Sequence, residues 1–110
     1  MGKGKSELLH GTLELLILKL LESDSLNGYA IGRRIEELTD DALKVEEGSL
    51  YPALYRMVRK GWLKASWGAS ENNRRAKFYR LTTAGRRQLA AETENWVDFT
   101  AAIGKIVGRA

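Results

Sequence analysis

The fold of this chain is decided by residues 48–81, GSLYPALYRMVRKGWLKASWGASENNRRAKFYRL. Together with the six residues that follow, this stretch holds ten basic side chains and one acidic one, so residues 48–87 carry a net charge of +9. Residues 1–47 hold six basic and ten acidic side chains, and the 110-residue chain has a formal net charge of +4. Because like charges crowded together cost folding free energy, the block indicates that the protein meets a polyanion.

The first part of the stretch has the pattern of a helix over Gly48–Lys60. Apolar residues recur there at the spacing of one helix face and are expected to point inward: Leu50, Leu54, Met57 and Val58. Pro52 fits the first turn, where its missing N–H costs nothing, and Gly61 fits the position just after the helix end. The outward face would then carry hydroxyl and basic side chains, namely Ser49, Tyr51, Tyr55, Arg56 and Arg59.

The second part alternates with period two over Trp62–Trp67 and Lys77–Leu81, which predicts an antiparallel hairpin. One face of the first strand is expected to lie opposite Tyr79 and Leu81, and that face holds Leu63, Ala65 and Trp67. Trp62 and Trp67 are expected to pack in the core and at the hinge. The turn and the start of the second strand supply basic side chains suited to phosphate, namely Arg74, Arg75 and Lys77.

Three more helices are predicted around this unit. Residues 7–22 are apolar almost all round, so a second subunit is expected to cover what one small domain leaves bare. Asn27 is expected to cap a helix that ends near Leu38, and Thr82 to cap a last helix that runs to about Val107. Residues 1–6 are expected to form a frayed tail.

The last helix carries apolar residues at heptad spacing, interrupted by Glu92. Such a seam favours a partner helix, and a symmetric dimer would cover both the first and the last helix. The interface expected for a homodimer comprises Leu9, Leu13, Leu16, Leu89, Trp96, Phe99, Ile103 and Ile106.

The order of these elements predicts a mainly α fold with a small β-hairpin, a winged helix-turn-helix followed by a long helix. Residues 1–81 would form the DNA-binding unit and residues 82–110 the dimerisation helix of the same domain. Such a unit places its third helix in the major groove of double-stranded DNA and its hairpin, the wing, along the phosphates.

Other classes of function find little support in the residues. The chain has no cysteine and one histidine, His10, which is expected to lie at the surface, so we expect no metal site and no cofactor. It also lacks a phosphate-binding glycine loop and the residues of a catalytic triad, so we expect no catalytic residues and no enzyme. The apolar run 8–21 is too short and too charged to span a membrane, and a cytoplasmic location is expected.

Four segments together resemble the PadR family of bacterial transcriptional regulators: LNGYAI at residues 26–31, GSLYPAL at 48–54, GWL at 61–63 and NRRAKFYRLT at 73–82. The resemblance covers roughly residues 8–107, and the chain is similar to the short members that have one C-terminal helix. It implies a homodimeric repressor that binds a palindromic operator and releases it when a small molecule is sensed.

The same resemblance implies roles for individual residues. The family's recognition helix falls on Ser49, Tyr51, Tyr55 and Arg56, and its wing falls on Asn73, Arg74, Arg75 and Lys77. Members that sense aromatic compounds bind them between the subunits beside the last helix, where Trp96 and Phe99 stand in this chain.

Three alternatives stay open at this point. The chain is a regulator with no small-molecule effector, or a winged-helix module whose basic wing grips an acidic protein or RNA, or a ligand carrier whose aromatic seam is its whole function. Trp96 and Phe99 are equally consistent with plain dimer packing.

Overall fold

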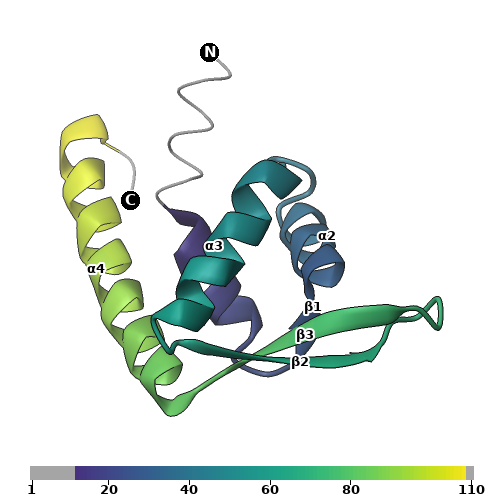
Figure 1. The fold of residues 1–110 in the computed structure, drawn as a ribbon. Helices are drawn as coiled ribbons and strands as arrows, with labels where there is room; N and C mark the ends of the chain where they lie inside the picture. Colours follow the sequence, from purple (N-terminus) through teal and green to yellow (C-terminus); the bar gives the residue numbers. More distant parts are fainter. Residues whose placement is uncertain (1–11, 109–110) are drawn as a thin grey trace.

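The structure is a computed structural model that describes residues 12–108. A first helix, described over residues 12–20, is followed by β1 (Leu26–Asn27), α2 (Gly28–Leu38), α3 (Glu47–Arg59), β2 (Leu63–Ala69), β3 (Arg75–Leu81) and α4 (Thr83–Val107) (Figure 1). The predicted fold class is confirmed: the chain is mainly helical, with a small antiparallel sheet and a long last helix.

The sheet has three strands in the order β1-β3-β2, all antiparallel. Leu63 pairs with Leu81 and Ala65 with Tyr79, so these four residues share one face of the sheet, as the alternation predicts. The sequence did not predict β1, since two residues are too short to show a period. The strands of the wing are also longer than expected, because they continue to Ala69 and from Arg75 and leave only residues 70–74 for the turn.

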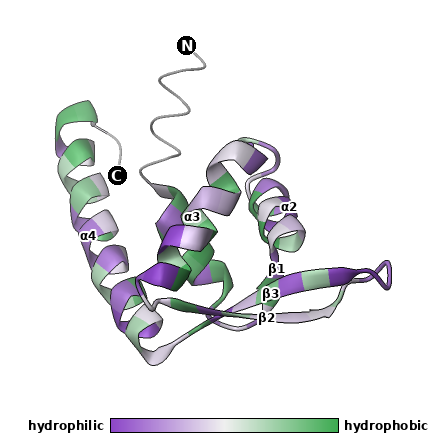
Figure 2. Cartoon of the chain, in the orientation of Figure 1, coloured by the Kyte–Doolittle hydropathy of each residue, from purple (hydrophilic) through white to green (hydrophobic). Residues whose placement is uncertain are grey.

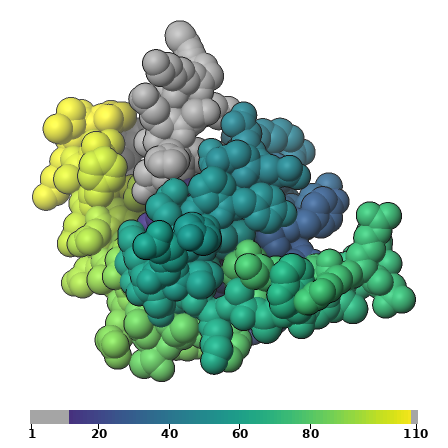
Figure 3. All heavy atoms as spheres, in the orientation of Figure 1, coloured from purple at the N-terminus to yellow at the C-terminus, as the bar shows by residue number. Residues whose placement is uncertain are grey.

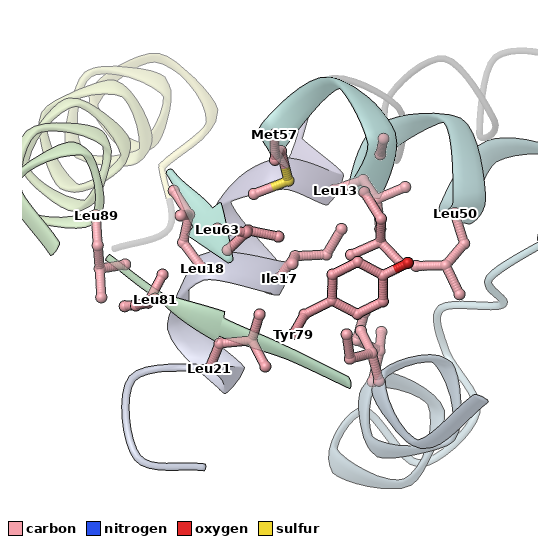
Figure 4. Close-up of a cluster of buried hydrophobic side chains, with 14 residues drawn as sticks. Leu13, Ile17, Leu18, Leu21, Leu50, Met57, Leu63, Tyr79, Leu81 and Leu89 are labelled. Atoms are coloured by element: carbon pink, nitrogen blue, oxygen red, sulfur yellow. The ribbon is translucent and has the colours of Figure 1, made fainter. Parts of the chain in front are cut away.

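The core lies where the first helix, the inner side of α3 and the base of the sheet meet (Figure 4). The first helix contributes side chains on several of its sides, namely Leu13, Ile17 and Leu18, and Leu21 joins them just after the helix ends. The chain itself therefore covers most of this helix. Each fully buried aliphatic side chain stabilises the fold by about 1.5–3 kcal/mol.

Two residues expected at the dimer interface belong to this core instead. Leu13 is 1% exposed and Leu89 is 5% exposed within the single chain, so neither has surface left for a partner. Leu16 is half-buried and packs against the same core. The tail residues 1–6, Leu9 and His10 lie outside the described residues.

The third helix ends as predicted but begins earlier than expected. The Gly61 amide donates to the Val58 carbonyl and the Trp62 amide to the Met57 carbonyl, at 3.0 Å each, and Gly61 has the positive φ of 81° that this ending requires. At the other end the helix starts at Glu47, so Pro52 lies in its second turn. The helix therefore lacks one backbone hydrogen bond there, on its exposed side.

The start of α4 is fixed to the end of α3. The Thr82 hydroxyl caps α4 by accepting from the Gly85 amide at 3.0 Å, and it donates to the Gly61 carbonyl at 2.6 Å. The Thr82 amide donates to the Trp62 carbonyl at 3.0 Å. Gly85 lies so close to the Trp62 carbonyl oxygen that a Cβ at this position would overlap that atom. Beyond this junction α4 forms one side of the molecule (Figure 1).

Candidate nucleic-acid interface

The outward face of α3 is exposed and carries aromatic and basic side chains. Tyr55 is 64% exposed, and Tyr51, Pro52 and Arg59 are exposed beside it. The Arg59 guanidinium lies over the Tyr55 ring, 5.7 Å from its centroid. Because the apolar side of α3 is buried, these side chains are fixed on the side that faces away from the core (Figure 3).

Tyr51 lies against the first turn of α2. An added Cβ at Gly28 would come within 2.6 Å of the Tyr51 Cε1 atom and 3.0 Å of its hydroxyl oxygen. Only glycine at position 28 therefore allows the ring its position. On its inner side Tyr51 neighbours Tyr79, whose pKa is raised by burial and, to a lesser extent, by Tyr51.

Arg56 differs from the other predicted contacts on α3. Its Nε atom lies 3.4 Å from a carboxylate oxygen of Glu14 on the first helix, and both side chains are partly buried. Arg56 is thus held at the flank of α3, between that helix and the outward face. Ser49 is half-buried on the same flank.

The basic wing projects from the body of the molecule (Figure 3). Its turn is built by Asn73, whose φ is 60° and whose amide donates to the Ser70 carbonyl at 2.9 Å. Asn73, Arg74, Arg75 and Lys77 are all exposed. Figure 2 shows the outer part of the wing as largely hydrophilic.

Trp67 is not in the core or at the hinge, where the sequence placed it. It lies on the wing and is 59% exposed, with the Arg75 guanidinium 4.4 Å and the Lys77 ammonium 5.7 Å from its ring centroid. Tyr29 is exposed as well, at the first turn of α2. Its position two residues before the buried Ile31 places it off the apolar stripe of that helix.

The charge of this surface is largely uncompensated. Among residues 12–108, Arg56 is the one basic side chain of the 48–87 block that forms an ion pair. The cations of the wing and the Arg59 guanidinium have no carboxylate partner in this part of the chain. They are available for an anionic ligand, and their spread over two elements suits an extended one.

A second exposed surface lies on α4 and is apolar. Beyond Leu89, the seam residues Trp96, Phe99, Ile103 and Ile106 are exposed, Ile106 by 89%. The Trp96 and Phe99 rings lie 6.1 Å apart, tilted by 40°. Glu92, which interrupts the seam, accepts a hydrogen bond from the Gln88 side chain at 2.7 Å. Figure 2 shows the C-terminal end of α4 as hydrophobic.

The described residues offer neither a metal site nor a membrane-spanning helix. No group of three or more histidine, cysteine or carboxylate side chains in residues 12–108 could hold a metal ion. No helix in that range has the length and apolar character needed to cross a membrane.

Comparison with known proteins relates the chain to transcriptional regulators. The model of the transcriptional regulator PadR-like family matches residues 17–91. A transcriptional regulator from Clostridium thermocellum is 30% identical, with a TM-score of 0.84 over 92% of this chain and 98% of that one. A PadR-like regulator from Bacillus cereus is 26% identical, with a TM-score of 0.79 over 92% and 96%. An uncharacterized protein of Lysinibacillus sphaericus is 27% identical over 94 residues, which is 86% of each chain.

The contact between Gly28 and Tyr51 generates a testable prediction. In a Gly28→Ala variant the new methyl group displaces the Tyr51 ring, which should lower affinity for double-stranded DNA by about tenfold, the effect of one lost hydrogen bond to a charged group. Overpacking should also lower the free energy of unfolding by about 1–3 kcal/mol. Fluorescence anisotropy and denaturant titration measure the two effects.

Gly32→Ala is the matched control on the same helix. Its Cβ would meet nothing closer than 3.7 Å, so duplex affinity should be unchanged and stability should rise by about 0.5–1 kcal/mol. If Gly28→Ala binds the duplex as tightly as Gly32→Ala, the position of the Tyr51 ring is irrelevant to binding.

Proposed function

Because the chain belongs to the transcriptional regulator PadR-like family, and is therefore a DNA-binding regulator, we propose that it is a cytoplasmic, homodimeric repressor released from a palindromic operator by a small-molecule effector. The observation that carries the DNA-binding mode is the outward face of α3 with the exposed basic wing beside it, where neither Arg59 nor a cation of the wing forms an ion pair within residues 12–108.

In the proposed complex α3 enters the major groove. Tyr55 and Arg59 lie at the centre of its outward face and meet base edges, whereas Tyr51 and Ser49 donate their hydroxyls to phosphates. Arg56 reaches the DNA only after it leaves Glu14, so it contributes from the flank. Asn73, Arg74, Arg75 and Lys77 follow the backbone from the wing.

The partner proposed for α4 is a second copy of the chain. Exposed apolar side chains follow one side of the helix over residues 96–106, and a contiguous apolar patch of this kind marks an interaction surface. The heptad spacing suits an identical helix, and a two-fold pair presents two α3 helices to two half-sites. The interface members that remain after the core is assigned are Leu16, Trp96, Phe99, Ile103 and Ile106, with Leu9 outside the described residues.

The same aromatic pair is the proposed effector site. Trp96 and Phe99 are close enough to share one flat ligand and remain partly exposed in the single chain. A planar molecule that enters between two such helices changes the angle between the subunits. Because the two α3 helices must bind both half-sites at the same time, a dimer with a changed angle between its subunits can keep only one of the two contacts.

Salt dependence tests the phosphate contacts of the wing. The affinity of the wild-type protein for a fluorescein-labelled, mixed-sequence duplex should fall steeply with salt, since each neutralised phosphate contributes about −0.9 to the slope of log K against log salt. Arg74→Ala removes one phosphate contact and should therefore make that slope shallower by about 0.9. Lys105→Ala, on α4, removes a charge away from the interface and should leave the slope unchanged. A wild-type affinity independent of salt would contradict the proposed binding mode.

Sedimentation equilibrium tests the dimer. The wild-type protein should have twice the chain mass of 12.3 kDa. Ile103→Glu places a charge in the apolar seam and should give monomers, because burying an unpaired carboxylate costs several kcal/mol. Ala101→Glu adds the same charge on the opposite side of α4 and should remain dimeric. A monomeric wild-type protein would refute the pairing.

Binding of anilinonaphthalene sulfonate, an aromatic dye with a flat naphthalene ring, tests the effector site. Its emission should rise on binding to the dimer, and it should displace the labelled duplex. Trp96→Ala should abolish both effects because the aromatic wall is lost, whereas Trp67→Ala, on the wing, should retain the dye binding. Equal dye binding by both variants, or no release of DNA, would favour a regulator without a small-molecule effector.

A further inference from the structure

The exposed Trp67 on the wing has no role in the interface described so far. Large aromatic side chains are usually covered, since their burial provides much of the energy of cores and interfaces. Trp67 instead lies where the wing has left the body of the molecule, flanked by Arg75 and Lys77. It adds nothing to the core, which on β2 includes Leu63 and the half-buried Ala65.

The register of the hairpin shows which way Trp67 faces. Side chains along a strand alternate between the two faces of a sheet, and cross-strand partners share a face. Trp67 is paired with Lys77, and two positions along the ladder Ala65 is paired with Tyr79. Tyr79 points toward Leu50 of α3 (Figure 4). Trp67, Lys77 and Arg75 therefore continue, on the free part of the wing, the face that packs against α3 at its base.

This placement puts an apolar ring and two cations on the same side of the sheet as α3. If a duplex is held against α3 and the wing, the part of it that lies against this face of the wing is the edge of a groove. Deoxyribose rings alternate with phosphates along that edge. The faces of its bases are covered by their neighbours in the stack. The accessible partners of an indole are then the C–H edges of the sugars, and those of its flanking cations are the phosphates on either side.

We propose that Trp67 is a DNA-contacting residue of the wing, with its indole against the deoxyribose rim of a groove and with Arg75 and Lys77 on the adjacent phosphates. The inference rests on the proposed function and extends it from a purely electrostatic wing to one with an apolar contact. The cations already lie against the indole in the free protein, so less side-chain freedom is lost on binding.

Fluorescence anisotropy with a labelled, mixed-sequence duplex and with one of its single strands tests the contact. Trp67→Ala should lower duplex affinity by about tenfold, comparable to the loss of one aromatic contact to a nucleotide. The indole is neutral, so the salt slope should stay as in the wild type, whereas Arg75→Ala should reduce it by about 0.9. Trp67→Phe should keep most of the affinity. Leu38→Ala, an exposed apolar residue at the end of α2, should bind as the wild type does.

Thermal melting keeps the result interpretable, because an exposed Trp67 predicts an unchanged melting temperature for Trp67→Ala. A second readout uses a Trp62→Phe/Trp96→Phe variant, in which Trp67 is the one remaining tryptophan of the chain. The duplex should quench its emission and protect it from acrylamide.

Each contrary result has a distinct meaning. If the wild type binds the duplex and Trp67→Ala binds equally well, the inference fails and the proposed function stands. The inference also fails if Trp67→Ala reduces the salt slope, since Trp67 then acts only by positioning the cations. It fails as well if Trp67→Ala lowers affinity for the single strand more than affinity for the duplex, since Trp67 then stacks on bases. A wild-type protein that binds neither nucleic acid would overturn the proposed function and this inference with it.

Discussion

The burial of the inner side of α3 is the constraint on which the rest of the structure depends. Leu50, Ala53, Leu54 and Met57 are almost fully buried between the first helix and the base of the sheet. Rotating α3 about its axis would expose these side chains and bury the Arg59 guanidinium, and both changes cost several kcal/mol. The face that carries Tyr55 and Arg59 is therefore fixed outward by the core.

The second constraint is the junction that joins α3 to α4. Carbonyls just beyond the end of α3 hold Thr82, and Thr82 caps α4. Gly85 allows the helix to cross this point without a clash. In the proposed dimer, the angle between two α4 helices is thereby linked to the distance between two α3 helices. In the proposed dimer, this link would give the proposed effector at Trp96 and Phe99 a physical route to the outward face of α3.

The sequence predicted those features that follow from local periodicity and end signals. The bounds of α2 and α4, the Asn27 and Thr82 caps, the Gly61 helix end and the face that Leu63 and Ala65 share with Tyr79 and Leu81 are confirmed. The two-residue strand β1 could not be predicted, because it exists only through its pairing with β3. The helical spacing placed Leu13 and Leu89 on apolar faces. It could not show whether those faces pack in the core or against a second subunit, because a core face and an interface have the same spacing of apolar residues.

Only part of the candidate site was predicted, because local periodicity does not show how distant segments pack against one another. A helical pattern places Tyr55 and Arg59 outward, but the ion pair of Arg56 with Glu14 depends on how the first helix crosses α3. The exposure of Trp67 depends on how far the hairpin extends beyond the core, which strand alternation does not reveal. The proximity of Gly28 to Tyr51 likewise comes from tertiary packing.

Site-directed cleavage of DNA tests the central claim, that two α3 helices of a dimer enter the grooves of one duplex. The chain has no cysteine, so a Pro52→Cys variant can carry an iron chelate on a single thiol at the outward face of α3, and Lys105→Cys on α4 is the reference. On a duplex selected by the protein from a random pool, a dimer bound in this way should give two clusters of strand breaks about one helical turn apart for Pro52→Cys and none for Lys105→Cys. Breaks spread evenly along the duplex, or equal cleavage by both variants, would contradict it.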